Sequence, residues 1–430
     1  MADPHVTETS KKSNKRIYFY VAILYFLFMS DFICRLGVNA IFPVIQQDMN
    51  LTDPQIGMLS SVVFLAMSLF VLPISFFADK WSKKKSITLM SGIWSFGTVI
   101  FGLATSFPLM LLSRLGVGLG NSAYAPTSTS MVTSWFPKEK WGKLLGIYNT
   151  AMPLGSAIGS IICGALATQY GWRTTVGAIA IFSMITFVFS FFLPKTDSSV
   201  SKGPKNQSVE NTAKTTNNTV TVKSALNILL KNRSLLLVCI AAACFALTVS
   251  INQTWVVMFY VREVGLSVGL AASIFGITSL IGATMYPLGG IIMDKWYKKD
   301  IRSRVWFPAL MYSLKGAICL FAFATKNIPL IIFGSVILQL AVSCGHAANQ
   351  ELVPAQYKSM SYGFYVVFIQ GLGALGPVIA GFVVTKIGLT NMLLVTQAIL
   401  FVSAFFFILA GFSYVKDFNK ARAAEKSALS

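Results

Sequence analysis

The chain has 430 residues, of which 55% are hydrophobic and only 12% are charged, and its formal net charge is +20. A soluble domain usually carries about 25% charged residues, so these fractions exclude an ordinary soluble protein and are typical of a protein with many membrane-spanning segments. The positive charges lie in short segments beside apolar runs, a pattern that membrane topology explains better than nucleic-acid binding. We therefore expect no nucleic-acid partner.

Twelve apolar segments follow one another along the chain, and each is long enough to cross a bilayer, which takes about 20 residues. They cover roughly residues 17–43, 56–78, 86–105, 108–134, 144–168, 174–194, 234–260, 267–293, 306–325, 328–352, 361–386 and 390–414. An even number of spans puts both termini on the same side of the membrane. The sequence thus predicts an all-α membrane protein with twelve transmembrane helices.

The distribution of Lys and Arg predicts the orientation. If the N-terminus is cytoplasmic, 28 of the 35 basic residues lie in cytoplasmic segments, four lie on the opposite side and three lie within spans. The positive-inside rule therefore places both termini in the cytoplasm. Short loops and compact length are typical of a bacterial protein, so we expect a multi-pass protein of the inner cell membrane.

Residues 195–225 are rich in Ser, Asn, Thr and Lys and contain almost no large apolar side chains. Such a composition is typical of a flexible linker. It divides the spans into two groups of six. The predicted organisation is an N-terminal tail (1–16), a first bundle (17–194), a cytoplasmic linker (195–233), a second bundle (234–414) and a C-terminal tail (415–430).

Two motifs occur once in each half of the chain. "PISFFADKWSKKK" at 73–85 matches "PLGGIIMDKWYKKD" at 287–300, and "WFPKEKWGKLLGIY" at 135–148 matches "LVPAQYKSMSYGFY" at 352–365. The offsets are about 215 and 217 residues, so the register is nearly constant. Two matches at nearly one spacing indicate an internal repeat, and parallel six-span repeats place a substrate site between the halves.

These motifs resemble those of the major facilitator superfamily of transporters, along essentially the whole chain. The family's loop pattern G-x-x-x-D-[RK]-x-G-x-[RK]-[RK] corresponds to "SFFADKWSKKK", with Ser75 and Ser82 where glycines are usual, and again to "GIIMDKWYKK". The resemblance implies two pseudo-symmetric six-helix bundles that work by alternating access, with gating contacts at the cytoplasmic helix ends. The predicted gating residues are Asp79, Lys80, Asp294, Lys295 and Glu351.

Several spans resemble the Spinster-like and anion–cation symporter branches of that family, in "RLGVGLGNSAYAP", "YNTAMPLGSAIG", "SIFGITSLIGATMYPLGG" and "NQELVP". Those branches commonly carry an acid after the G-x-G of helix 4 and another directly before the arginine of helix 1. Asn121 and Cys34 stand at these two positions here. Proton coupling through the usual helix-4 site is therefore not supported by the sequence.

The first span contains two charges, Asp31 and Arg35, in "MSDFICRLGVN". A charge at the bilayer centre costs about 2.5–3.5 kcal/mol on insertion scales. The two residues are four apart and share a helix face. Either they form a structural ion pair, or Asp31 binds a proton and Arg35 binds an anion. We favour the functional interpretation, because intramembrane ionisable residues mark transport pathways by default.

Three further ionisable residues lie within spans. Arg114 begins "RLGVG" on helix 4, where the family resemblance implies a role in coupling or in helix contacts. Lys315 lies midway along its span and either faces a cavity or extends toward an interface. His346 is either packed among other side chains or carries protons. Asp31 and His346 are the predicted proton-coupling residues.

The predicted substrate-binding residues combine these cations with neutral polar side chains. In the family, helices 1, 4, 7 and 10 line the cavity, although each neutral residue could instead join two helices by a hydrogen bond. The candidates are Arg35, Arg114, Asn121, Tyr124, Asn252, Gln253, Trp255, Lys315 and His346.

Three intramembrane cations against one acid favour an anionic substrate, and guanidinium groups bind carboxylate, phosphate or sulfonate in bidentate fashion. We expect a monomeric secondary transporter that moves an organic anion with protons or by exchange, within membrane lipid. The branch resemblance adds an amphipathic anion, such as a bile salt or lysolipid, as one possibility. No nucleotide loop, metal cluster or catalytic array is present, so we expect no cofactor and no enzyme.

Two other hypotheses stay open at the level of sequence. A multidrug exporter for lipophilic cations would need an acid exposed in a hydrophobic cavity, and Asp31, beside Arg35, is the only candidate. A non-transporting membrane sensor usually carries an added signalling domain, and the tails here are short.

Overall fold

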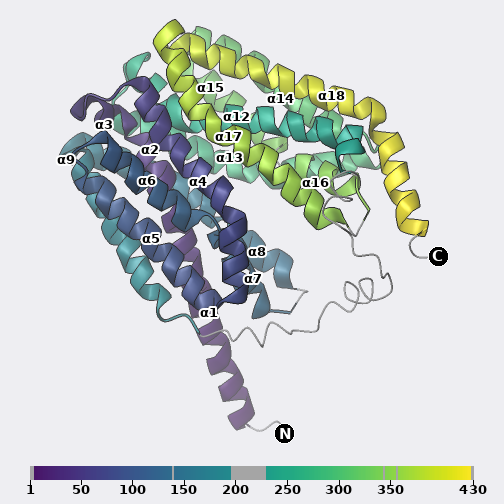
Figure 1. Cartoon of the computed structure of the whole chain (residues 1–430), viewed down its shortest axis with the longest axis horizontal. Coiled ribbons are helices and arrows are strands. Elements are labelled where there is room, and N and C mark those ends of the chain that lie inside the picture. The colour runs from purple at the N-terminus through teal and green to yellow at the C-terminus, as the bar shows by residue number, and fades with distance from the viewer. Residues whose placement is uncertain (1–3, 138–139, 195–228, 342–343, 355–356, 428–430) are drawn as a thin grey trace. The chain divides into compact units, whose positions relative to one another are not determined.

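The computed structural model of the chain describes residues 4–137, 140–194, 229–341, 344–354 and 357–427 (Figure 1). Within these ranges the regular structure is entirely helical, which confirms the predicted all-α fold. The helices are α1 (Pro4–Phe32), π-helical η1 (Ile33–Gly37), α2 (Val38–Ala40), α3 (Phe42–Asp48), α4 (Asp53–Lys80), α5 (Lys83–Leu103), α6 (Phe107–Asn121), α7 (Tyr124–Ser134), α8 (Trp141–Asn149), α9 (Ala151–Ser190), α12 (Arg233–Arg262), α13 (Val268–Tyr297), α14 (Ser303–Ala324), α15 (Ile328–Leu338), 3₁₀-helical η3 (Gln339–Ala341), α16 (Cys344–Glu351), α17 (Lys358–Ile387) and α18 (Leu389–Ser427).

Within the described ranges, ten helical segments are long and apolar enough to cross a membrane. One of them, Leu144–Ser190, has 47 residues and is kinked at Gly171, so it contains two of the predicted spans. The predicted span 108–134 is divided between α6 and α7, each of which is too short to cross alone. With these two adjustments the segments correspond to the twelve predicted spans.

Proline explains the break between α6 and α7. Pro126 has no N–H to donate to the carbonyl of Ser122, and its ring would clash with that carbonyl in a regular helix. The chain accordingly leaves helical geometry at Ala123, where φ is −119° and ψ is 10°. The predicted span 328–352 is also divided, into α15, η3 and α16, and residues 342–343 lie outside the described part.

Two glycines join neighbouring spans almost without a loop. Gly171 (φ 78°, ψ 167°) kinks α9, and Gly388 (φ 82°, ψ 165°) separates α17 from α18. Only glycine adopts this backbone region without strain. The two positions are 217 residues apart, the same offset as one of the repeated motifs, so the internal repeat extends to the backbone geometry of these turns.

The chain divides into two compact units, and each is described here by itself. Unit 1 comprises Met1–Leu51, Val62–Lys214 and Ser267–Gly276, and unit 2 comprises Thr52–Ser61, Thr215–Leu266 and Ile277–Ser430.

In unit 1, α9 packs against α1 and η1, and α5 packs against α6 and α9. Small residues permit these contacts. A Cβ at Gly155 would lie 2.6 Å from the carbonyl oxygen of Met29, and one at Gly159 would lie 3.0 Å from Ile33 Cα. On α6, Gly118 approaches α4 and Gly120 approaches α5 at similarly short distances. Membrane helices associate closely through such positions.

In unit 2, α12 packs against α17 and α18, and α14 packs against α18. The rings of Phe245 and Tyr312 stack with their centroids 4.8 Å apart. Residues 52–61, which include the first turns of α4, also belong to this unit, where the Ser60 and Thr254 hydroxyl oxygens are 2.8 Å apart.

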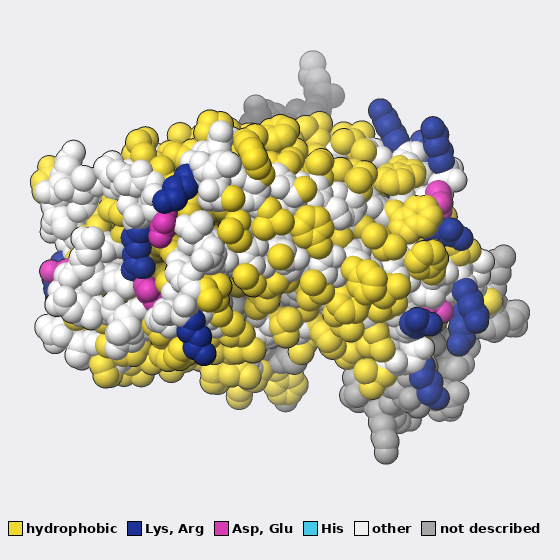
Figure 2. Space-filling model, turned by 90° about the horizontal axis from the view of Figure 1, so that it is seen from above, with side chains coloured by type: hydrophobic (Ala, Val, Ile, Leu, Met, Phe, Trp, Pro, Cys, Tyr) yellow, Lys and Arg dark blue, Asp and Glu magenta, His cyan; other side chains and the backbone are white. Residues whose placement is uncertain are grey.

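Large hydrophobic side chains are exposed on many of the helices. Leu69 and Phe77 of α4 are each 68% exposed, and Phe412 of α18 is 74% exposed. Figure 2 shows one face on which hydrophobic side chains form a broad area and the charged side chains lie at its margins. A water-soluble protein rarely exposes so much contiguous apolar surface, so these faces meet lipid and the chain is a multi-pass membrane protein.

The Asp48 carboxylate at the end of α3 is bound by two residues beside the Gly171 kink. Trp172 Nε1 donates to Asp48 Oδ2 at 2.8 Å, and Arg173 donates to the same oxygen at 2.5 Å. The hydrogen bond from Trp172, followed by that from Arg173, lowers the pKa of Asp48 below its ordinary value of 3.8. The first span is thereby tied to the turn within α9.

This contact predicts a pH-dependent stability. A carboxyl group with a lowered folded-state pKa stabilises the fold above its unfolded pKa, about 3.9, and loses this effect as pH falls through the folded value. We therefore expect Asp48→Asn to melt at a lower temperature than the parent at pH 7, with the difference closing below about pH 4. Thermal unfolding in detergent across this range measures it. Glu425→Gln, which removes an exposed pair on α18, serves as the control, and a pH-independent difference would contradict the interpretation.

Candidate functional site

Asp31 and Arg35 lie together inside unit 1. Asp31 lies in the last turn of α1 and Arg35 lies in η1, and the two residues are 3% and 8% exposed. Arg35 Nε is 3.9 Å from Asp31 Oδ1, a distance at which the two charges attract but do not form a hydrogen bond. Among the described residues, neither atom has a hydrogen-bond partner. The pair thus retains hydrogen-bonding capacity in a buried place.

The other side chains around the Arg35 guanidinium are two aromatic rings and a thioether. Its guanidinium carbon lies 4.5 Å from the ring centre of Phe32 and 5.8 Å from that of Phe64, and Nη1 donates to Met67 Sδ at 3.3 Å. Aromatic faces and thioethers stabilise a cation only modestly. Within the described part of the chain, this guanidinium donates no hydrogen bond to an oxygen.

Arg114 contrasts with Arg35, because its donors are in use. It is 1% exposed, and its guanidinium donates to the carbonyl of Cys34 at 3.1 Å and to Asn39 Oδ1 at 2.8 Å. Cys34 and Asn39 lie within and just beyond η1. π-Helical turns are rare and often occur at functional sites, and Arg114 binds one residue within this turn and one just after it. Arg114 therefore holds the segment that carries Arg35.

The polar residues where α6 ends and α7 begins also differ in whether their hydrogen-bonding groups are in use. The Tyr124 hydroxyl donates to the carbonyl of Leu24 at 2.7 Å, and its fully buried ring meets Trp94 edge-on at 5.1 Å. Asn121 is 3% exposed, and neither atom of its side-chain amide finds a hydrogen-bond partner in the described structure. Unsatisfied buried amides are uncommon, so Asn121 has unused donor and acceptor capacity.

Three contributors to this arrangement were not predicted from the sequence. Asn39 is a polar residue four positions after Arg35, and that spacing is the signal that could have found it. Phe64 and Met67, on α4, have no distinguishing sequence feature, because nothing in an apolar helix marks the residues that face a distant cation.

In unit 2, Trp255 is fully buried and its Nε1 donates to the carbonyl of Pro377 at 3.2 Å. Asn252 Oδ1 accepts from Gln397 Nε2 at 3.2 Å, and Gln397 Oε1 has no partner in the described part of the unit. Gln253 is half-buried. Gln397, on α18, was not predicted.

The two isolated titratable candidates of unit 2 occupy different environments. Lys315 is 3% exposed on α14 and forms no ion pair with any described residue. The His346 ring meets Tyr365 edge-on at 5.0 Å and lies 5.8 Å from Tyr362, and its Nδ1 has no partner among the residues placed.

Two predicted gating residues meet through a third residue, Arg304. Its guanidinium forms ion pairs with Asp294 at 3.0 Å and with Glu351 at 3.1 Å, and Glu351 accepts from the Tyr414 hydroxyl at 2.9 Å. Lys295 is exposed. The side chains of Asp79 and Lys80 lie outside the described residues. The structure thus joins the second copy of the loop motif to α16 and α18, and the gating roles stay predictions.

Known proteins share this architecture and sequence pattern. The family model described as Major Facilitator Superfamily matches residues 21–350. The hexuronate transporter of Bacillus subtilis (strain 168) is 25% identical over 383 residues, which cover 85% of this chain and 88% of that protein. A probable galactarate/D-glucarate transporter of the same organism, GudP, is 25% identical over 423 residues, covering 91% and 90%.

A solved structure of a bacterial homologue of the human lysosomal transporter Spinster has a TM-score of 0.80 to this chain. It is 19% identical and covers 93% of this chain and 98% of its own, so it supports the fold alone. The family match spans well over half of the chain and agrees with the twelve spans, and the predictions of the family, the fold and a non-enzymatic transport role are confirmed. The chain belongs to the major facilitator superfamily of membrane transporters.

Proposed function

We propose that this transporter carries a small carboxylate anion of the sugar-acid class, coupled to protons, across the inner cell membrane. The observation that carries the proposal is the Arg35 guanidinium, which is buried yet donates no hydrogen bond to an oxygen among the described residues. A buried guanidinium without oxygen acceptors is costly. A carboxylate that supplied two parallel acceptors would satisfy it.

Arg35 is a better candidate than Arg114 for this role. Arg114 already donates to Cys34 and Asn39, so a substrate that recruited it would have to replace these bonds. Arg35 would exchange only a sulfur contact and a loose ion pair. We assign substrate binding to Arg35 and a positioning role to Arg114.

The proton step follows from charge balance at the pair. Asp31 and Arg35 together are neutral, so an arriving carboxylate adds one negative charge in a buried place. A proton on Asp31 would remove that charge, and Asp31 Oδ1 is free to carry it because no described residue hydrogen-bonds to that atom. Substrate and proton would then travel in the same direction, as in a symporter, and Asp31 would release the proton when the substrate leaves.

The curated relatives support the substrate class. Their names specify hexuronate and galactarate or D-glucarate, all sugar acids with one or two carboxylates. Such substrates also present hydroxyl groups, and the unpartnered amide of Asn121 could bind one of them. We retain Asn252, Gln253, Lys315 and His346 as candidates in unit 2, where Lys315 adds a second uncompensated positive charge.

Two narrower alternatives have weaker support. A bile salt or lysolipid is suggested only by the resemblance of several spans to the Spinster-like branch, and the solved Spinster homologue, at 19% identity, supports the fold and no substrate. A lipophilic cation would have to reach Asp31 past Arg35, whose Nε is 3.9 Å from that carboxylate.

The proposal is tested in proteoliposomes that contain the purified protein and a pH-sensitive dye. We would add D-glucuronate, D-galacturonate, D-glucarate, acetate, a bile salt and a lysolipid in turn. A sugar acid should move protons through the parent protein. Asp31→Asn should abolish this proton movement but keep exchange of labelled against unlabelled substrate. If every anion fails in the parent protein, the substrate class is wrong, and if Asp31→Asn still moves protons, Asp31 is a structural residue.

A second test separates the two arginines. Arg35→Lys keeps the charge but loses the bidentate geometry, so we expect the KM for substrate to rise about tenfold or more while the melting temperature changes little. Arg114→Lys should instead lower the melting temperature by about 5 °C or more, because a single ammonium nitrogen cannot replace the forked hydrogen bonds to both Cys34 and Asn39. Transport kinetics and thermal unfolding measure both variants. The reverse pattern would exchange the two roles, and unchanged anion transport in Arg35→Gln would remove Arg35 from the site.

A further inference from the structure

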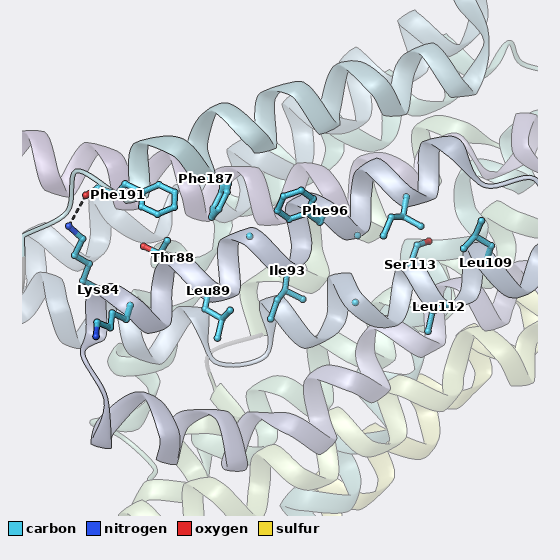
Figure 3. A pocket seen from close by; sticks show the side chains of 15 residues that line it. Lys84, Thr88, Leu89, Ile93, Phe96, Leu109, Leu112, Ser113, Phe187 and Phe191 are labelled. Carbon is cyan, nitrogen blue, oxygen red and sulfur yellow. Dashed lines mark hydrogen bonds between the residues drawn. The ribbon is translucent and has the colours of Figure 1, made fainter.

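Unit 1 carries a groove of about 730 Å³ along α5, α6 and α9, apart from the site described above (Figure 3). Much of its lining is open to the outside, since Leu89 and Phe96 are each 53% exposed and Leu112 is 64% exposed. The apolar side chains that line it are Leu89, Ile93, Phe96, Ile100, Leu109, Leu112, Phe187 and Phe191. In a membrane, such a surface meets the hydrocarbon chains of lipid.

Glycines form part of the groove lining. Gly92, Gly97 and Gly116 all border it. At Gly116 a Cβ would meet nothing closer than Gly97 Cα, 4.0 Å away. The space above this position is therefore open, and a larger side chain there would fill the groove without displacing the backbone.

One end of the groove is basic. In Figure 3, Lys84 lies at this end and donates to the carbonyl of Phe191, at 2.7 Å. An ammonium group has three donors, so two remain. Lys85 is exposed, and its Nζ lies 5.7 Å from the ring centre of Trp81. Neither lysine forms an ion pair with any acid that the structure describes.

We propose that the groove binds one anionic phospholipid, whose phosphate contacts Lys84 and Lys85 and whose acyl chain lies along α5. The dimensions agree, because the twelve residues from Leu89 to Ile100 span about 17 Å along a helix and half of a bilayer core measures about 15 Å. Basic pockets between helices on the cytoplasmic side are typical sites for anionic head groups. The orientation proposed above places both lysines on that side.

Two comparisons within the chain favour an anionic head group over lipid in general. A second groove, of about 790 Å³, runs between α5 and α9, but its one cation, Arg173, is paired with Asp48. In the second copy of the loop motif, Asp300 stands where the first copy has Lys85. The excess positive charge therefore belongs to the first groove and to the first copy.

Native mass spectrometry of the full-length protein tests the proposal, with equimolar phosphatidylglycerol and phosphatidylcholine supplied in detergent. The parent should retain phosphatidylglycerol preferentially. Lys84→Gln/Lys85→Gln should weaken its binding about 30-fold, since each basic residue near an anionic surface contributes a factor of about five. The matched control is Lys298→Gln/Lys299→Gln, which removes the same charge from the second copy and should change binding little.

A second pair of variants blocks the acyl chain and keeps the charge. Gly116→Leu should reduce retention of phosphatidylglycerol by about tenfold or more. Gly177 lines the second groove, and a Cβ there would have nothing within 4 Å. Gly177→Leu should therefore not reduce the retention of phosphatidylglycerol. Equal retention of the two lipids by the parent would overturn the anionic assignment. Equal losses in the Lys84/Lys85 and control pairs, or an unaffected Gly116→Leu, would overturn the groove as the site. Because binding is read without transport, these outcomes are independent of the substrate test.

Discussion

The hold of Arg114 on the first span is the interaction on which the candidate site depends. A regular helix through residues 33–37 would use its carbonyls for its own hydrogen bonds and would leave fewer acceptors for Arg114. The observed π-helical turn instead offers Arg114 the carbonyl of Cys34, and Asn39 supplies a side-chain oxygen. The distorted backbone thus supplies hydrogen bonds to a positive charge that stays buried in the membrane. The same distortion sets the position of Arg35. The two arginines have different environments for this reason, although their side chains are identical.

Close packing of α9 against the first span supports the same conformation of that span. Gly155 and Gly159 bring α9 against α1 and η1 at distances that no side chain would permit. The hydrophobic effect contributes little to the association of helices within a membrane. Close van der Waals packing between the helix surfaces therefore has to supply the attraction. A helix with an irregular segment can pack this closely against its neighbour only if the neighbour has small residues along the contact. The hydrogen bonds of Arg114 and the close contacts of Gly155 and Gly159 therefore stabilise the same conformation of the first span.

Hydropathy, loop charges and the repeated loop motif were sufficient for the fold class, because span length and positive-charge asymmetry are set by the bilayer. The positions of the helix breaks were not predicted. Pro126 lies within the predicted span 108–134, and whether a proline bends or divides a membrane helix depends on what satisfies the freed carbonyl. In the site, Asp31, Arg35 and Arg114 stood out as charges in apolar runs. Phe64, Met67 and Gln397 could not be predicted, since their importance lies only in what they face. Arg304 was not among the predicted site residues, yet it joins Asp294 to Glu351.

The single-residue turns at Gly171 and Gly388 limit what the protein offers to a large molecule at these two places. At each turn two adjacent spans reverse direction with hardly any polypeptide between them. A protease needs an extended segment of several residues, and an antibody needs an epitope of comparable size. These two turns offer neither. Immunological detection and limited proteolysis will therefore not report on either of them, although each joins two membrane spans.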